Sequence, residues 1–171
     1  MNKEIVVTYF EPFGGRDTNT SKEVASLLSS YFSIELPVSW DNAEKVLLDN
    51  LTKNTKCLFL LGEAKSYQDV TVELVARNIA NGVDNYGVQK IEENIGQDNL
   101  ETSIDFSKAN LRVNYSDNAG KYLCNYIYYF SLKNIKGTNI VFIHLPYPRD
   151  DLSTIDMKEK VEEVISYVVR N

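Results

Sequence analysis

Short apolar runs alternate with stretches of helical spacing along this 171-residue chain. The runs at 4–10, 56–61 and 139–145 are rich in β-branched, leucine and aromatic residues and are followed by glycine or proline, which is typical of strands. The run at 56–61 is continuously apolar, as expected when both faces of a sheet are covered. We therefore expect these three strands, with a shorter one at 33–38, in the centre of the fold.

Besides the stretch around Cys124, three stretches between and after these runs predict helices. A capping-box pattern, Thr20 and Glu23, precedes one apolar repeat, and Asp41 precedes a second that reaches about residue 53. The third helix starts near Ser153 and is amphipathic, with a single apolar stripe. That stripe comprises Met157, Val161, Val164, Ile165 and Val168.

The region from 70 to 115 departs from this alternation. Residues 70–77 alternate in polarity and predict a strand with Glu73 and Arg77 on the same face. Residues 79–110 are polar and contain glycines without a sustained period. We expect a long irregular segment there, of the kind that often forms functional loops or lids. A short strand at 111–115 follows it.

Strands that alternate with helices predict an α/β fold, a three-layer α/β/α sandwich around a mixed, mainly parallel sheet. The irregular 70–115 region would supply the departure from pure βαβ order. We expect a single domain over residues 1–171, because this length suits one hydrophobic core and no linker interrupts it.

Charge and composition limit the classes of function that the chain could have. The net charge is -6 and no cluster of lysine or arginine stands out, which argues against nucleic-acid binding. The first apolar run is too short for a signal peptide or a membrane span, so we expect a cytoplasmic protein with no membrane partner. Two cysteines without a CxxC pair, and a single histidine, offer no zinc site, and we expect neither a metal nor another cofactor.

Three residues carry the candidate chemistry: Cys124, His144 and Glu73. Each has an ordinary structural explanation, because a lone cysteine or histidine in an apolar run is usually part of the core, and Glu73 could pair with Arg77 on a solvated strand face. Together, however, a thiol, an imidazole and a carboxylate are the parts of a cysteine-nucleophile site, in which the acid orients the ring. The sequence pattern alone leaves open whether the three side chains meet.

The thiol needs activation, because its ordinary pKa of about 8.5 leaves it mostly protonated at neutral pH. A polar turn at 116–118 predicts the start of an apolar helix, which places Cys124 in about the second turn, where the helix dipole is already weak. His144 stands two residues before Pro146, near a strand end of the kind where α/β folds gather functional groups. We therefore expect His144 to contribute most to lowering the pKa of the thiol.

Four motifs occur in the order and roughly the spacing of one known family. They are FEPFGG at 10–15, VELVARN at 72–78, NAGKYLCN at 118–125 and FIHLPY at 142–147. In these motifs the chain resembles the pyroglutamyl peptidase I (pyrrolidone-carboxylate peptidase) family of cysteine peptidases over nearly its whole length. The resemblance implies a catalytic triad of Cys124 as nucleophile, His144 as general base and acid, and Glu73 as the residue that orients the imidazole.

The resemblance also implies the reaction. A cysteine exopeptidase of this family removes N-terminal pyroglutamate (5-oxoproline) from peptides through a thioester acyl-enzyme. Phe10 and Phe13 would then flank the flat lactam ring, and the partners would be small peptides with a blocked N-terminus. Homo-oligomers, dimers or tetramers, are implied as well.

Two departures from the family pattern concern the substrate. Where family members usually read GQAGGR, residues 62–67 read GEAKSY, so Glu63 replaces a neutral amide and becomes a further candidate for substrate binding. An arginine that the family places after Glu73 has no counterpart at 81–83. Two alternatives therefore stay open: a thiol amidase or hydrolase for another small lactam or acylated amine, and a catalytically impaired small-molecule-binding homologue of the same fold.

Overall fold

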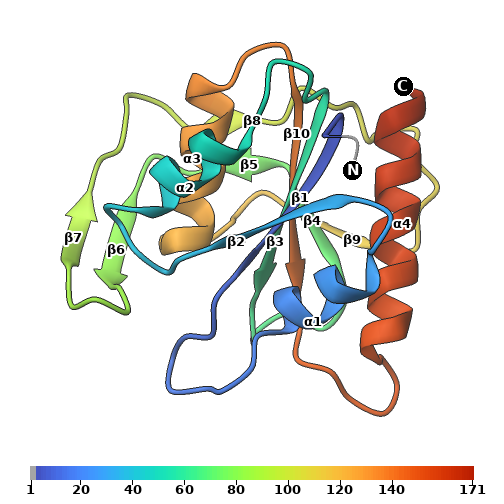
Figure 1. Ribbon diagram of the computed structural model, residues 1–171, viewed down its shortest axis with the longest axis horizontal. Coiled ribbons are helices and arrows are strands. Elements are labelled where there is room, and N and C mark those ends of the chain that lie inside the picture. The colour runs from blue at the N-terminus through green and yellow to red at the C-terminus, as the bar shows by residue number, and fades with distance from the viewer. Residues whose placement is uncertain (1–2) are drawn as a thin grey trace.

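Six strands among the described residues, 3–171, form the central sheet of the computed structural model, in the order β2-β1-β3-β10-β4-β9 (Figure 1). Neighbouring strands are parallel except for β10 and β4, which are antiparallel. The predicted mixed, mainly parallel sheet of an α/β fold is thereby confirmed. The strands are β1 (Ile5–Phe10), β2 (Phe32–Leu36), β3 (Cys57–Glu63), β4 (Thr71–Glu73), β9 (Asn114–Ser116) and β10 (Asn139–Leu145).

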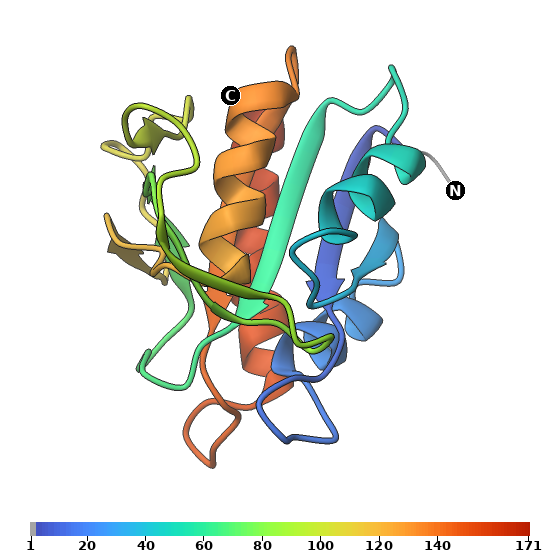
Figure 2. The ribbon, with the colours of Figure 1, turned by 90° about the vertical axis from the view of Figure 1, so that its left-hand side faces the viewer.

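Helices cover both faces of this sheet and complete three layers. Figure 1 shows α2 and α3 on one side of the sheet and α4 on the other, and Figure 2 shows α3 in front with α4 behind it. Alternate residues of β3 serve the two cores: Leu58 and Leu60 pack with α2 and α3, whereas Phe59 and Leu61 pack with α1 and α4. The helices are α1 (Thr20–Leu27), α2 (Ala43–Asn50), α3 (Leu123–Asn134) and α4 (Thr154–Arg170).

The C-terminal helix α4 forms as its pattern predicts. Ser153 is the N-cap: its hydroxyl accepts a hydrogen bond from Asp156 N at 3.2 Å, and the Asp156 carboxylate accepts one from Ser153 N at 2.8 Å. The five residues of the predicted apolar stripe, from Met157 to Val168, are the buried residues of the helix. The start and the buried face of α4 are therefore confirmed.

Two other predicted helix starts are shifted. Helix α1 is capped by Asn19, whose side chain accepts a hydrogen bond from Ser21 N at 2.9 Å, and Thr20 is the first helical residue instead of the cap. Helix α2 begins at Ala43, so the cap predicted at Asp41 is wrong. Several residues that can cap a helix stand next to one another at both starts, and the local pattern does not choose between them.

The strand predicted at 70–77 is two strands that belong to different sheets. β4 ends at Glu73, Leu74 lies between the two strands, and β5 pairs with β8. The predicted common face of Glu73 and Arg77 is wrong: Glu73 is fully buried, whereas Arg77 is partly exposed and donates to Asn118 Oδ1 at 3.0 Å. The two additional strands are β5 (Val75–Ala76) and β8 (Leu100–Glu101).

Part of the segment expected to be irregular, 79–110, is a β-hairpin. β6 (Ala80–Val83) and β7 (Gln89–Glu93) pair in antiparallel fashion, and the Asp84 carboxylate accepts two backbone hydrogen bonds at the turn between them. The prediction is wrong here because β7 is almost wholly exposed and therefore has no alternation of apolar and polar residues. The strand expected at 111–115 is present as β9, shifted toward the C-terminus.

Membrane spans and clustered metal ligands are both missing from residues 3–171. No helix in this range has the length and apolar character needed to cross a membrane. No group of three or more histidine, cysteine, aspartate and glutamate side chains in this range is arranged to hold a metal ion.

Candidate active site

Cys124 lies in the first turn of α3, not in the second. The helix begins at Leu123 with Tyr122 as its N-cap, so the start predicted at 116–118 is wrong. The polar residues there belong to β9, which pairs with β4, and to the loop that follows it. Backbone N–H groups in a first helical turn lack intrahelical acceptors and form the positive end of the helix dipole. The thiol is therefore where these groups act most strongly.

The thiol rests against Gly62 in β3. A Cβ atom on Gly62 would lie 2.8 Å from Cys124 Sγ and 2.7 Å from Phe142 Cζ, so a side chain at this position would displace the thiol. Gly62 pairs with His144 in the β3–β10 ladder, and neighbouring strands are about 4.8 Å apart. The missing side chain of Gly62 thus lets the thiol approach the strand position next to His144.

His144 and Glu73 form a buried pair. His144 Nδ1 lies 2.6 Å from Glu73 Oε1, and the two side chains are 4% and 0% exposed. In the antiparallel register of β4 and β10, Thr71 lies opposite His144 and Glu73 lies opposite Phe142. Glu73 is therefore two residues along the strand from the position opposite His144 and on the same face of the sheet. Because Nδ1 faces Glu73, Nε2 is the ring nitrogen left for other contacts.

Tyr67 joins this pair from the loop between β3 and β4. Its hydroxyl donates to Glu73 Oε1 at 2.5 Å, and its ring stacks on the His144 imidazole with centroids 4.9 Å apart and an interplanar angle of 26°. Sequence reasoning missed Tyr67 as a site residue. A tyrosine in a polar loop carries no local signal of a contact with two other strands, and only its place in the divergent GEAKSY stretch drew attention to it.

Several contacts act on the charge of Glu73. Burial by itself favours the neutral carboxyl, but the hydrogen bond and positive charge of His144, with hydrogen bonds from Tyr67 and Ser116, hold the pKa of Glu73 below its ordinary value. Glu73 is therefore a carboxylate at neutral pH. A buried carboxylate beside an imidazole can stabilise the ring in its cationic form.

The surroundings of the Cys124 thiol favour its protonated form. Burial raises its pKa to about 12, and the negative charge of Glu73 and, more weakly, that of Glu63 act in the same direction, whereas the backbone N–H of Cys124 opposes them. The lowered pKa expected from the sequence is wrong for this unliganded arrangement.

A cavity of about 490 Å³ opens beside these residues, and Cys124 and His144 lie in its wall. Phe13 and Tyr122 form an apolar part of the lining, with ring centroids 6.1 Å apart. This volume lies in the range of small-molecule sites. The other lining residues are Glu63, Ala64, Ser66, Tyr67, Ser116, Asn118, Ala119, Gly120 and Lys121.

The three predicted substrate-binding residues have different surroundings. Phe13 lines the cavity, whereas Phe10 is 1% exposed and packs in the core with α2 and α3, so its contact with a ligand stays a prediction. Glu63 also lines the cavity, but its carboxylate accepts hydrogen bonds from Thr20 N and Thr20 Oγ1, both at 2.6 Å, and lies 3.2 Å from Arg16 Nε. Glu63 therefore also holds the N-terminus of α1.

Comparison with protein families identifies the chain. The family described as pyroglutamyl peptidase matches residues 3–166. The chain belongs to the pyroglutamyl peptidase family. This match takes in all six strands of the central sheet and the three residues Cys124, His144 and Glu73, so the family resemblance found in the four motifs is confirmed.

Two relatives in the pyroglutamyl peptidase family align with most of this chain. Pyrrolidone-carboxylate peptidase 2 of Caldanaerobacter subterraneus subsp. tengcongensis is 28% identical over 207 residues, which cover 98% of this chain and 97% of the relative. The pyrrolidone-carboxylate peptidase of Thermococcus litoralis is 32% identical over 176 residues, which cover 88% of this chain and 79% of the relative.

Two solved structures superpose on nearly the whole chain. The pyrrolidone carboxyl peptidase of Fervidobacterium islandicum AW-1 superposes with a TM-score of 0.84 at 27% identity and covers 97% of this chain and 98% of its own. Pyroglutamyl peptidase I of Bacillus amyloliquefaciens superposes with a TM-score of 0.88 at 23% identity and covers 99% of this chain and 98% of its own, which supports the fold.

Proposed function

We propose that this member of the pyroglutamyl peptidase family removes N-terminal pyroglutamate from peptides, with Cys124 as nucleophile, His144 as general base and acid, and Glu73 as the orienting carboxylate. One observation carries the proposal. A thiol and an imidazole from two elements line one cavity, and a carboxylate from a third element lies 2.6 Å from Nδ1 of the imidazole. Family membership supplies the class of substrate.

Acylation begins when Cys124 Sγ attacks the carbonyl carbon of the pyroglutamyl residue while His144 Nε2 takes the thiol proton. Because burial raises the pKa of the thiol, proton transfer accompanies the attack in this mechanism. Glu73 holds the ring through Nδ1 and stabilises the imidazolium that forms. The backbone N–H of Cys124, in the first turn of α3, is the donor we assign to the oxyanion.

His144 then gives its proton to the leaving amine, the C–N bond breaks, and the shortened peptide departs with a free N-terminus. The pyroglutamyl carbonyl is now joined to Cys124 Sγ as a thioester. Water attacks this carbonyl as His144 takes one of its protons, and the imidazolium returns a proton to the thiolate when the C–S bond breaks. Pyroglutamate is released and one water molecule is consumed.

The proposed ring site follows from the cavity lining. Phe13 and Tyr122 supply apolar surface for a flat, uncharged lactam. The Glu63 carboxylate has acceptor capacity beyond the bonds from Thr20 and Arg16, and it can accept the lactam N–H. A carboxylate offers acceptors alone, so the lactam carbonyl must be bound by another group.

A cytoplasmic location fits the same mechanism. Cys124 has to remain a free thiol, and a reducing compartment keeps it so. We expect the protein to retain turnover under cytosolic thiol concentrations and to lose it on oxidation of Cys124. Full activity of the oxidised protein in the absence of reductant would argue against this assignment.

Turnover of a pyroglutamyl-coumarin amide by the wild-type protein and by Cys124→Ala tests the proposal. We expect coumarin release by the wild type and none above background by the variant. A Cys57→Ala protein is the matched control, because Cys57 is a buried cysteine in β3, and it should retain release. Equal release by wild type and Cys124→Ala, or none by either, would contradict the proposal.

Glu63 in the cavity lining favours a second candidate, a thiol amidase for another small lactam or acylated amine, because a carboxylate stands where family members usually have a neutral amide. A panel of coumarin amides with six-membered lactam, prolyl and N-acetylated acyl groups separates the two. Preference for pyroglutamyl over every other group supports the first candidate. A reversed preference supports the second, provided that Cys124→Ala abolishes it.

A further inference from the structure

We propose that Tyr67 is a positioning residue of this site, which fixes the Glu73 carboxylate and the His144 imidazole relative to each other. The kinetic test of this proposal rests on the function proposed above. Its geometry is independent of substrate identity, because each contact joins residues of this chain.

The hydroxyl of Tyr67 and Nδ1 of His144 bind the same oxygen. Tyr67 OH lies 2.5 Å and His144 Nδ1 2.6 Å from Glu73 Oε1. A phenol has one proton, and the carbonyl oxygen of Asn118 is more distant, at 3.1 Å, so the donated bond goes to Glu73. Two donors on one oxygen define the rotation of the carboxylate, and thereby the direction from which it meets the imidazole.

The ring of Tyr67 constrains the imidazole as well. It stacks on His144 at an interplanar angle of 26°, and Phe142 contacts the same imidazole with centroids 4.8 Å apart at 58°. Stacking limits rotation of the imidazole ring. Nδ1 therefore stays directed at Glu73, and Nε2 stays directed at the cavity. One tyrosine thus acts on both members of the pair.

Tyr67 stays a donor across the working pH range. Burial, with the hydrogen bond to Glu73, raises the pKa of the phenol well above its ordinary value. The groups that face the Glu73 carboxylate are His144 from β10, Tyr67 from the β3–β4 loop and Ser116 from β9, and their hydrogen bonds lower its pKa. Loss of the phenol proton donor therefore raises the pKa of Glu73.

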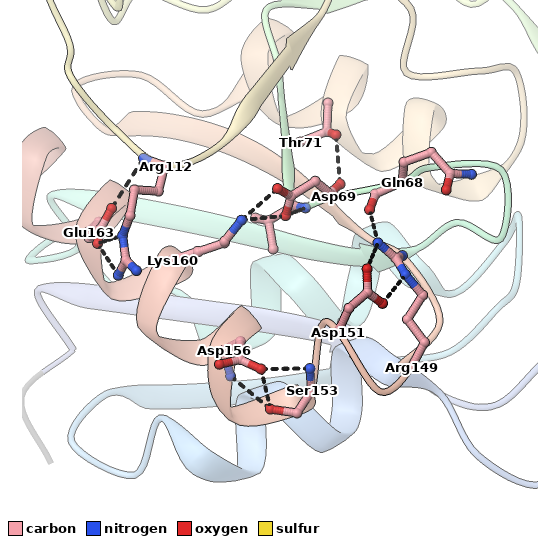
Figure 3. A network of polar contacts seen from close by, with 11 residues as sticks. Gln68, Asp69, Thr71, Arg112, Arg149, Asp151, Ser153, Asp156, Lys160 and Glu163 are labelled. Atoms are coloured by element: carbon pink, nitrogen blue, oxygen red, sulfur yellow. Dashed lines mark hydrogen bonds and ion pairs between the residues drawn. The ribbon is translucent and has the colours of Figure 1, made fainter.

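The loop that carries Tyr67 is tied to the protein on its C-terminal side (Figure 3). The carbonyl oxygen of Gln68 accepts a hydrogen bond from Arg149 Nη2 at 2.6 Å, and the Asp69 carboxylate lies 2.6 and 2.5 Å from Lys160 Nζ of α4. These two anchors follow Tyr67 directly in the sequence. They set the main chain so that the phenol reaches Glu73, which a mobile loop would not do reproducibly.

Tyr67→Phe, which keeps the ring and removes the hydroxyl, is the principal test, with Tyr31→Phe as the matched control. Tyr31 is a partly buried tyrosine between α1 and β2. For Tyr67→Phe we expect kcat on a pyroglutamyl amide to fall about tenfold with KM within about twofold. The acid limb of the kcat profile should move up by about half a pH unit or more, because Glu73 protonates more easily. Tyr31→Phe should match the wild type.

A second readout needs no substrate. His144 is the only histidine, so the NMR signal of its Nδ1–H proton in histidine-labelled protein reports the bond to Glu73 directly. We expect a sharp downfield signal in the wild type and in Tyr31→Phe, and a shifted or exchange-broadened one in Tyr67→Phe. If the wild type fails to turn over pyroglutamyl amides, this readout still decides the positioning role.

Three results would overturn the proposal. The first is a Tyr67→Phe protein with unchanged kcat, acid limb and Nδ1–H signal. The second is an effect confined to KM, which would make Tyr67 a substrate contact. The third is an equal effect of Tyr31→Phe, which would indicate a general loss of stability.

Discussion

Gly62 lies directly against the thiol of Cys124, and the glycine is required there by space. A Cβ atom at this position would stand 2.8 Å from Cys124 Sγ and 2.7 Å from Phe142 Cζ, both too close for an undisturbed contact. Since Gly62 also pairs with His144 across the β3–β10 ladder, this contact places the thiol of α3 beside the strand position next to His144.

Gly62→Ala should therefore damage catalysis. Displacement of the thiol by about 1 Å is expected to lower kcat/KM about 100-fold, and overpacking should reduce the free energy of unfolding by about 1–3 kcal/mol. Gly96→Ala is the matched control, because its Cβ would overlap the Tyr129 side chain and not the thiol. That control should lose stability and keep kcat; equal losses of kcat in both variants would refute the spatial argument.

Glu73→Gln should retain the fold of the site and lose its charge. The amide oxygen can still accept from His144 Nδ1, but it does not stabilise the imidazolium, so kcat on a pyroglutamyl amide is expected to fall by about 10³ to 10⁴. Steady-state kinetics with a circular-dichroism spectrum as the check on folding would measure this. A loss smaller than tenfold would show that the carboxylate is not needed for proton transfer.

Glu73 should also contribute to stability in a pH-dependent way. Its pKa in the folded protein is below its ordinary value of 4.5, so the contribution is fully present above 4.5 and is lost as the pH falls through the folded pKa. The difference in free energy of unfolding between wild type and Glu73→Gln should therefore change in favour of the variant as the pH falls below 4.5. Urea unfolding at a series of pH values measures it, and a difference that is constant with pH would be inconsistent with the pair.

Ser153→Ala should weaken α4 without touching the site. Loss of the capping box is expected to lower the free energy of unfolding by about 1 kcal/mol, and kcat should stay at the wild-type value. Ser30→Ala, an exposed serine between α1 and β2, is the control. Urea titrations of the three proteins suffice; a change in kcat for Ser153→Ala would indicate that α4 is coupled to the catalytic residues.

Local pattern was sufficient for α4 and for the central strands. The capping box at Ser153 and the stripe from Met157 to Val168 are contained within one helix, so no distant contact is needed to interpret them. The continuous apolar run of β3 likewise reports that both of its faces are covered. These elements follow from the sequence because the residues that decide them are close together in the chain.

Other features depend on contacts between distant segments. The polar turn at 116–118 has the composition of a helix start, but pairing of β9 with β4 holds its first residue in a strand, so Cys124 moves to the first turn of α3. The sequence alone does not identify Tyr67 and Gly62 as site residues, because their contacts with His144 and Cys124 depend on the order of the strands in the sheet. Cys124, His144 and Glu73 could be proposed together from the sequence because family motifs stood in for the missing three-dimensional information.

Covalent labelling with a pyroglutamyl chloromethyl ketone tests the central claim most directly. The chain contains two cysteines, and only Cys124 lies at the cavity, so Cys57 is an internal control. We expect one equivalent of label on Cys124, none on Cys57, loss of turnover in proportion to labelling, and protection by a pyroglutamyl peptide. Label on Cys57 or on no cysteine, with pyroglutamyl amide turnover continuing, would contradict the account.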